Sequence, residues 1–129
     1  MGAFEVRTTE RACVVDITDR VLAEVAASGV TSGICLIGTR HTTVGVTINE
    51  PDSPLIHDLL RQLEKIAPRR DGYLHPDNSD SHMKAMLMGG SVAVPVVGGR
   101  LDLGTWQAVL LCEFDGPRRR TVRVDVTGG

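Results

Sequence analysis

The sequence predicts an α+β domain with a mostly antiparallel or mixed sheet and about three helices. Segments with strand character outnumber those with helical periodicity, and strands do not alternate regularly with helices as in doubly wound folds. A tight turn at Gly98-Gly99 joins neighbouring strands directly, because both glycines tolerate a positive φ. The chain has 129 residues and no internal repeat, which indicates one domain over residues 1–129.

The predicted strands are alternating or continuous apolar runs bounded by polar turns. They cover residues 4–9, 12–17, 32–38, 44–48, 91–97, 101–103, 105–114 and 121–126. Trp106, the single tryptophan, is expected in the core, and Gln107 is then expected on the other face of the same strand.

Two amphipathic helices are predicted before the middle of the chain. Thr18 is expected to cap a helix over residues 19–28, which Gly29 ends. Residues 51–54, with two prolines, open a second helix. The apolar stripe of that helix repeats at helical spacing and comprises Leu55, Ile56, Leu59, Leu60, Leu63 and Ile66. His57 lies on the opposite face and is expected in solvent.

Composition excludes several classes of function. The chain has 14 basic and 16 acidic residues and only 3% aromatic residues, which argues against a nucleic-acid or membrane-surface binder. No apolar run approaches the roughly 20 residues of a membrane span, and the start lacks the pattern of a secretory signal. Cys13, Cys35 and Cys112 lie far apart in apolar runs, so we expect buried free thiols and a cytoplasmic location.

The densest polar segment runs from Tyr73 to Lys84. One of Asn78, Ser79 or Asp80 is expected to cap a short third helix there. A segment this polar within a compact domain is either a solvated helix-entry loop or part of a metal or acid–base site.

Three histidines lie in polar loops: His41, His75 and His82. They lack the His-x-x-x-His spacing of a zincin helix, so only folding can bring them together. Three imidazoles would leave one tetrahedral position open, as catalytic zinc sites require. Histidines in polar loops are otherwise ordinary surface residues, and the spacing alone leaves both interpretations open.

Acidic residues beside these histidines suit a site. Glu50 ends the strand that begins after His41, and Asp77 and Asp80 lie between the two histidines of the polar segment. A carboxylate there can orient an imidazole or transfer a proton. A simple helix cap is the alternative role of Asp80.

Basic residues near the same segments suit an anionic ligand. Lys84 falls in the first turns of the third helix, where a phosphate group is favoured. The run Arg118-Arg119-Arg120 opens a strand, so alternate members point to opposite faces. We expect one or two of them in solvent and one at a site.

Five motifs occur in chain order over nearly the whole sequence. They are His41-Thr-Thr-x-Gly-x-Thr-Ile-Asn-Glu50, Tyr73-x-His75, Asn78-Ser-Asp-x-His82-x-Lys84, Leu103-Gly-Thr-Trp-Gln107 and Glu113-Phe-Asp-Gly-Pro-Arg118. This set resembles the YjbQ family, an uncharacterised family whose members are labelled secondary thiamine-phosphate synthases. Ser81 is a departure, because alanine is common there in the family.

The resemblance implies a pseudo-barrel sandwich that assembles as a homotrimer, with a metal-binding pocket near a subunit interface. It implies His41, His75 and His82 as the metal ligands. The remaining pocket residues that it implies are Glu50, Asp80 and Asn78 as catalytic groups and Lys84, Arg118, Trp106 and Gln107 as substrate or phosphate contacts.

Two classes of function follow. The first is a metal-dependent enzyme acting on small phosphorylated or anionic substrates, nominally a thiamine-phosphate synthase. A tri-histidine site prefers zinc and suits a hydrolase, whereas diphosphate chemistry normally uses Mg²⁺ held by carboxylates. The second is a non-catalytic trimeric protein that binds a metal or ligand, with the metal in a structural role.

Overall fold

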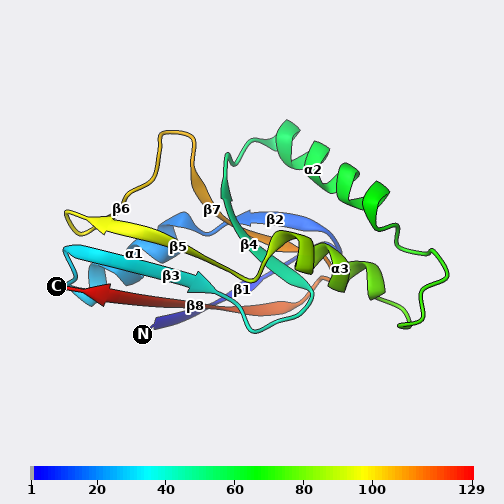
Figure 1. Ribbon diagram of the computed structural model, residues 1–129, viewed down its shortest axis with the longest axis horizontal. Helices are drawn as coiled ribbons and strands as arrows, with labels where there is room; N and C mark the ends of the chain where they lie inside the picture. The colour runs from blue at the N-terminus through cyan, green and yellow to red at the C-terminus, as the bar shows by residue number, and fades with distance from the viewer. Residues whose placement is uncertain (1) are drawn as a thin grey trace.

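The computed structural model describes residues 2–129, and this range contains eight strands and three helices (Figure 1). The strands are β1 (Gly2–Arg7), β2 (Cys13–Asp16), β3 (Ser32–Gly38), β4 (Val44–Asn49), β5 (Ser91–Val97), β6 (Arg100–Leu101), β7 (Ala108–Glu113) and β8 (Arg119–Gly128). The helices are α1 (Thr18–Ser28), α2 (Ser53–Ile66) and α3 (Ser79–Met88).

The strands form two sheets, which confirms the predicted α+β class. One sheet has five strands in the order β1-β8-β3-β5-β6, and the other has three in the order β2-β7-β4. All the strand pairings found within residues 2–129 are antiparallel. Gly98 and Gly99 both have positive φ, at 59° and 75°, and join β5 to β6 as predicted.

The main core lies between the two sheets and one face of α1. β7 is buried along its whole length because both of its faces are covered. Its Val109 and Leu111 belong to the main core, whereas Cys112 belongs to a second cluster with Leu63 of α2 and Ala85 of α3. The helices α2 and α3 therefore pack on the face of β7 that lies away from the main core.

The start of α1 differs from the prediction that Thr18 caps it. Thr18 is the first helical residue, and its N–H and hydroxyl both donate to Asp16 Oδ1, at 3.0 and 2.6 Å. Its hydroxyl also accepts the N–H of Val109, which ties α1 to β7. Gly29 ends the helix with a φ of 71°, as predicted.

The amphipathic helix α2 begins with a side-chain cap, in which Asp52 accepts the N–H of Leu55 at 3.0 Å. Its apolar stripe is only partly covered. Leu63 is buried, but Leu55 and Ile66 are 40% and 66% exposed. None of the helices within residues 2–129 combines the length and apolar character needed to cross a membrane.

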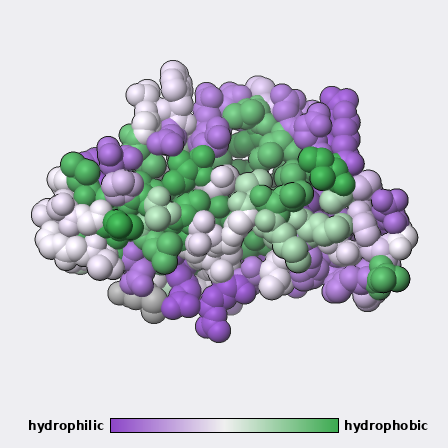
Figure 2. Space-filling model, viewed as in Figure 1, coloured by the Kyte–Doolittle hydropathy of each residue, from purple (hydrophilic) through white to green (hydrophobic). Residues whose placement is uncertain are grey.

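The outer face of the five-stranded sheet also carries exposed apolar side chains. Ile34 and Leu36 of β3 and Val97 of β5 are 57%, 46% and 61% exposed. Figure 2 shows apolar surface spread across the middle of the molecule in the same view as Figure 1. An uncovered apolar face of this kind typically marks an interaction surface.

The three cysteines are free thiols, as predicted. Cys35 and Cys112 are buried, and burial raises their pKa values to about 11 and about 12. Cys13 is partly buried. Thiols with pKa values this high are protonated and unreactive near neutral pH.

Candidate functional site

A hollow of ≈ 350 Å³ opens where the β3–β4 loop, the start of α3 and the β7–β8 segment meet. The residues that line it, which we call the histidine hollow, are Arg40, His41, Thr42, Thr43, Asn78, His82, Asp115, Arg118 and Arg120. Four of them were predicted as site residues: His41, Asn78, His82 and Arg118. Three arginines and one aspartate give the lining a positive character.

The imidazole of His41 is held by the backbone of β8. Its Nε2 accepts the N–H of Thr121 at 3.0 Å. Burial lowers the pKa of His41, and the positive charge of Arg120 lowers it further. The ring is therefore neutral near pH 7, with the Nε2 lone pair engaged and the proton on Nδ1.

His75 and His82 lie edge to face, with their ring centres 4.8 Å apart. Because zinc–nitrogen bonds are about 2.1 Å long, two imidazoles on one ion have ring centres roughly 5 Å apart, so this pair fits two ligands of one metal. Within residues 2–129, however, no three His, Cys, Asp or Glu side chains are grouped to hold a metal. The tri-histidine site stays a prediction, which requires His41 to give up its bond to Thr121.

A buried ion pair lies beneath the histidine hollow. Arg120 of β8 donates from Nε to Glu113 Oε1 at 2.8 Å and from Nη2 to Glu113 Oε2. Both residues are buried, and Glu113 is completely inaccessible. Thr8 donates to the same carboxylate at 2.7 Å, and Arg120 also donates to Thr43 at 2.7 Å. The guanidinium is thereby fixed in one orientation under the hollow.

Acidification is expected to remove the contribution of Glu113 to stability. Burial alone would raise its pKa, but hydrogen bonds from Arg120 and Thr8 outweigh burial and lower the pKa of the Glu113 carboxyl below its usual value. The pKa of Glu113 is lower in the folded protein than in the unfolded chain. Its contribution to the free energy of unfolding is therefore complete above the unfolded pKa of about 4.3, and it is lost as the pH falls through the folded pKa. Urea unfolding from about pH 7 to pH 3 should show a steeper loss for the wild type than for Glu113→Gln. Equal slopes would contradict this prediction.

Asp80 and Lys84 lie in a second buried network rather than in the histidine hollow. The carboxylate of Asp80 is inaccessible and accepts from Arg11 at 3.1 Å and from Lys84 at 2.9 Å. Lys84 also donates to Glu64 of α2 at 2.7 Å. Burial would raise the pKa of Asp80, but the hydrogen bonds from Arg11 and Lys84 outweigh it and lower the pKa. The alternative that Asp80 only caps α3 is therefore wrong, because Asp80 binds Arg11 before β2 and holds Lys84, which in turn binds Glu64 of α2.

Asn78 occupies the cap position of α3, but α3 has no side-chain cap, contrary to the prediction. The amide of Asn78 instead donates to Asp115 Oδ2 at 2.9 Å. Arg118 donates to the same oxygen at 3.0 Å and from Nε to the backbone carbonyl of Asp115 at 2.8 Å. Asp115 thus positions both Asn78 and Arg118 at the hollow.

Glu50, Trp106 and Gln107 line a different hollow, of ≈ 440 Å³. Three aspartates, Asp16, Asp19 and Asp52, line it too. Trp106 is 71% exposed, so the prediction that it lies in the core is wrong. The reason is that β7 begins only at Ala108, which leaves the tryptophan in the preceding turn. Within residues 2–129, this acidic hollow shares no lining residue with the histidine hollow.

Six residues of the histidine hollow and its base were not predicted as site residues: Arg40, Thr42, Thr43, Glu113, Asp115 and Arg120. The run Arg118-Arg119-Arg120 did indicate that its members differ in burial, because successive side chains of a strand point to opposite faces of the sheet. Arg120 is buried, whereas Arg118 and Arg119 are exposed. Glu113 and Asp115 fall within a quoted motif, but only the tertiary contacts reveal that they orient arginines.

The chain matches the family described as UPF0047 protein YjbQ-like over residues 2–129. A UPF0047 protein of Methanothermobacter thermautotrophicus is 43% identical over 125 residues, covering 95% of this chain and 87% of the relative. YugU of Bacillus subtilis is 42% identical over 132 aligned residues, covering 99% of both. A crystal structure of a YjbQ/UPF0047 family protein from Clostridium acetobutylicum is 40% identical, with a TM-score of 0.96 and coverage of 98% of this chain and 100% of that one. The chain therefore belongs to the YjbQ (UPF0047) family.

Proposed function

We propose that the protein is an enzyme that binds a small phosphorylated or otherwise anionic substrate in the histidine hollow. The observation that carries the proposal is the lining itself, which includes Arg40, Arg118 and Arg120 together with His41 and His82. Guanidinium groups are well suited to phosphate because they offer several N–H donors in one plane. A polar hollow with cationic walls favours an anion over a neutral ligand.

The arginines have distinct roles in this proposal. Asp115 fixes Arg118, and Glu113 fixes Arg120. Arg40 has no ion-pair partner within 4.0 Å among the residues that the structure describes, so it is the cation that an incoming anion would neutralise. Because the guanidinium groups of Arg118 and Arg120 are already held in position, less side-chain conformational entropy is lost when the ligand binds.

His41 is proposed to orient the substrate. Because its Nε2 accepts the N–H of Thr121, its Nδ1–H can donate a hydrogen bond to an anionic group in the hollow. A zinc ion is proposed on His75 and His82, where it would polarise a substrate oxygen or activate water. Thiamine-phosphate synthesis remains one candidate reaction and phosphate-ester hydrolysis another.

A second candidate function is a non-catalytic binding protein assembled from three copies. The exposed apolar side chains Ile34, Leu36 and Val97 favour it, because they would be covered by an assembly of copies. The protonated free thiols fit a reducing, cytoplasmic location in either case. In this second candidate the metal joins subunits and no turnover occurs.

The test uses the purified chain and methylphosphonate as a probe. Arg118→Gln is expected to weaken binding of the probe about 10- to 150-fold, because a charge-assisted hydrogen bond contributes about 1.5–3 kcal/mol. His82→Ala is expected to lower the bound metal below a tenth of the wild-type content and to cost at least about 100-fold in turnover on a panel of phosphate esters. His57→Ala is the matched control, because His57 is a solvent-exposed histidine on α2.

The outcomes separate the two candidates. Loss of metal and of turnover in His82→Ala, with His57→Ala unchanged, supports the enzyme. Metal removal that dissociates an oligomer, measured by light scattering, in a protein without turnover supports the binding protein. Unchanged probe affinity in Arg118→Gln contradicts the assignment of the histidine hollow as the anion site.

A further inference from the structure

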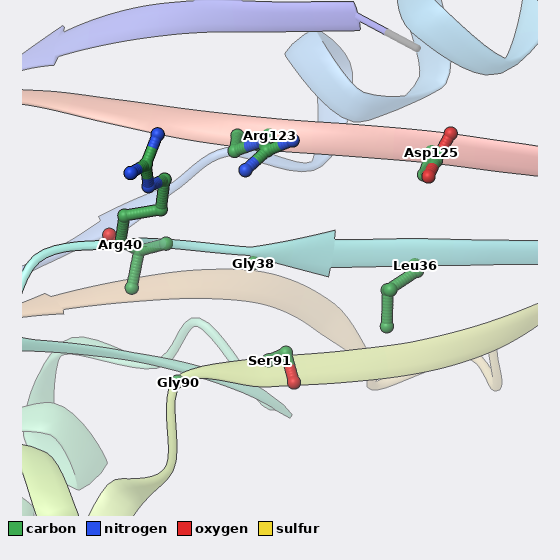
Figure 3. A pocket seen from close by; sticks show the side chains of 8 residues that line it. Leu36, Gly38, Arg40, Gly90, Ser91, Arg123 and Asp125 are labelled. Carbon is green, nitrogen blue, oxygen red and sulfur yellow. The ribbon is translucent and has the colours of Figure 1, made fainter.

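A second hollow, of ≈ 410 Å³, lies on the outer face of the five-stranded sheet. The residues that line it, which we call the sheet hollow, are Leu36, Gly38, Thr39, Arg40, Gly90, Ser91, Arg123 and Asp125. Figure 3 shows these residues on β8, on β3 and the loop after it, and at the start of β5. The sequence patterns and family motifs pointed to none of them.

Two glycines leave the floor of the sheet hollow without side chains. Gly38 lies opposite Ser91 on one side and Arg123 on the other. A Cβ on Gly38 would lie 3.2 Å from Cβ of Ser91, so the sheet surface is tight there. A Cβ on Gly90 would have only one neighbour within 4 Å, the carbonyl oxygen of Thr39 at 4.0 Å, so space is open beside it.

The charged groups of the sheet hollow are arranged for a polar, anionic ligand. Arg40 and Arg123 lie toward one end in Figure 3, and Asp125 lies farther along β8. Two guanidinium groups suit a phosphate or carboxylate. The carboxylate of Asp125 would repel a second anion but accepts a hydrogen bond from a ligand hydroxyl or ammonium group. The hollow therefore suits one anionic group at its arginine end.

Arg40 lines the sheet hollow and the histidine hollow alike. The two hollows are also adjacent along β8, because Thr121 holds His41 and Arg123 lines the sheet hollow. Thr121 and Arg123 are two residues apart on one face, so a rise of about 3.3 Å per residue separates them by about 7 Å. A ligand with anionic groups at about this spacing reaches both hollows.

We propose that the two hollows form one binding site for a small molecule with two anionic groups roughly 7–10 Å apart, with Arg40 between them. One group lies beside His41 in the histidine hollow, and the other lies against Arg123 in the sheet hollow. This inference rests on the proposed function and narrows its substrate to molecules with an anionic group at each end.

Alkane bisphosphonates of increasing length serve as a molecular ruler for this spacing. Binding of methylphosphonate is compared by calorimetry with that of bisphosphonates having two, four and six methylene groups. The longer bisphosphonates are expected to bind at least about tenfold more tightly than methylphosphonate, because the second group binds intramolecularly once the first is held. The two-methylene compound is expected to gain much less, since it does not span the hollows.

Variants of the sheet hollow test whether it is the source of the gain in bisphosphonate affinity. Arg123→Gln is expected to abolish the advantage of the long bisphosphonates over methylphosphonate. Ser91→Asp is a second variant, which places a carboxylate in the sheet hollow without replacing Arg123. Arg100→Gln, at an exposed arginine of β6, is the control for the same change in net charge.

The binding results distinguish failure of the two-hollow site from failure of the proposed function. Bisphosphonates that bind no better than methylphosphonate overturn the two-hollow site but leave the proposed function standing, provided that Arg118→Gln weakens both. The two-hollow site is also overturned if the bisphosphonates gain as much affinity in Arg123→Gln and Ser91→Asp as they do in the control Arg100→Gln. Absence of binding by every probe overturns the proposed function together with the inference.

Discussion

Replacement of Arg120 by methionine is expected to lower the free energy of unfolding by about 3–5 kcal/mol, because it leaves the inaccessible carboxylate of Glu113 without its cation. In a domain of this size that corresponds to a fall in Tm of roughly 10–20 °C. The variant should also be most stable, relative to the wild type, at acidic pH, where Glu113 becomes neutral. Urea and thermal unfolding at several pH values measure both effects.

The adjacent Arg119→Met variant is the matched control for Arg120. Arg119 pairs with Glu5 at 3.5 Å, and both side chains are more than half exposed. A surface pair of this kind contributes about 0–1 kcal/mol, so little change is expected. A double variant, Glu113→Gln with Arg120→Met, should recover part of the loss, because no buried charge is left unpaired. A cost for Arg120→Met no larger than that for Arg119→Met would refute the importance of the buried pair.

Replacement of Lys84 by methionine is expected to cost about 3 kcal/mol, since Asp80 is inaccessible and keeps only Arg11 as a charged partner. Asp80→Asn should cost a comparable amount. The double variant should lose less than the sum of the two, with a coupling of about 0.5–3 kcal/mol for residues in direct contact. Urea unfolding of the four proteins measures the coupling.

The same network should affect binding, because α3 carries His82 and Asp80 anchors α3 to Arg11. Methylphosphonate affinity is therefore expected to fall in Lys84→Met, although Lys84 does not line the histidine hollow. Lys65→Met, on an exposed part of α2, should change stability by less than about 0.5 kcal/mol. Additive losses in the double-variant cycle would show that Asp80 and Lys84 act independently.

Local sequence patterns predicted most elements of the fold. The strand at 32–38 and the strand at 91–97 have the predicted bounds, and Gly29 and Gly98-Gly99 adopt the predicted conformations. These features depend on alternation, on apolar runs and on the φ angles that glycine alone adopts easily. Helix caps were predicted less well, because Thr18 and Asn78 use their side chains for contacts with other elements.

The candidate site was predicted in part. His41, Asn78, His82 and Arg118 do share one hollow. Lys84 was expected at a phosphate group because it is polar and near a helix start, but the fold buries it against two carboxylates. Charged residue type alone does not distinguish a ligand contact from a buried ion pair, since both need a nearby opposite charge.

By itself, the sequence determined the family, the α+β class and the segments that carry the histidines, because periodicity and motif order are properties of the chain. Only the tertiary structure decided which polar residues meet. It paired Glu113 with Arg120, turned Trp106 outward and separated Glu50 and Gln107 from His41. It also joined the histidine hollow to the sheet hollow through Arg40. The reason is that these contacts depend on strand register and on the packing of α3 against the three-stranded sheet, which bring together residues distant in the chain.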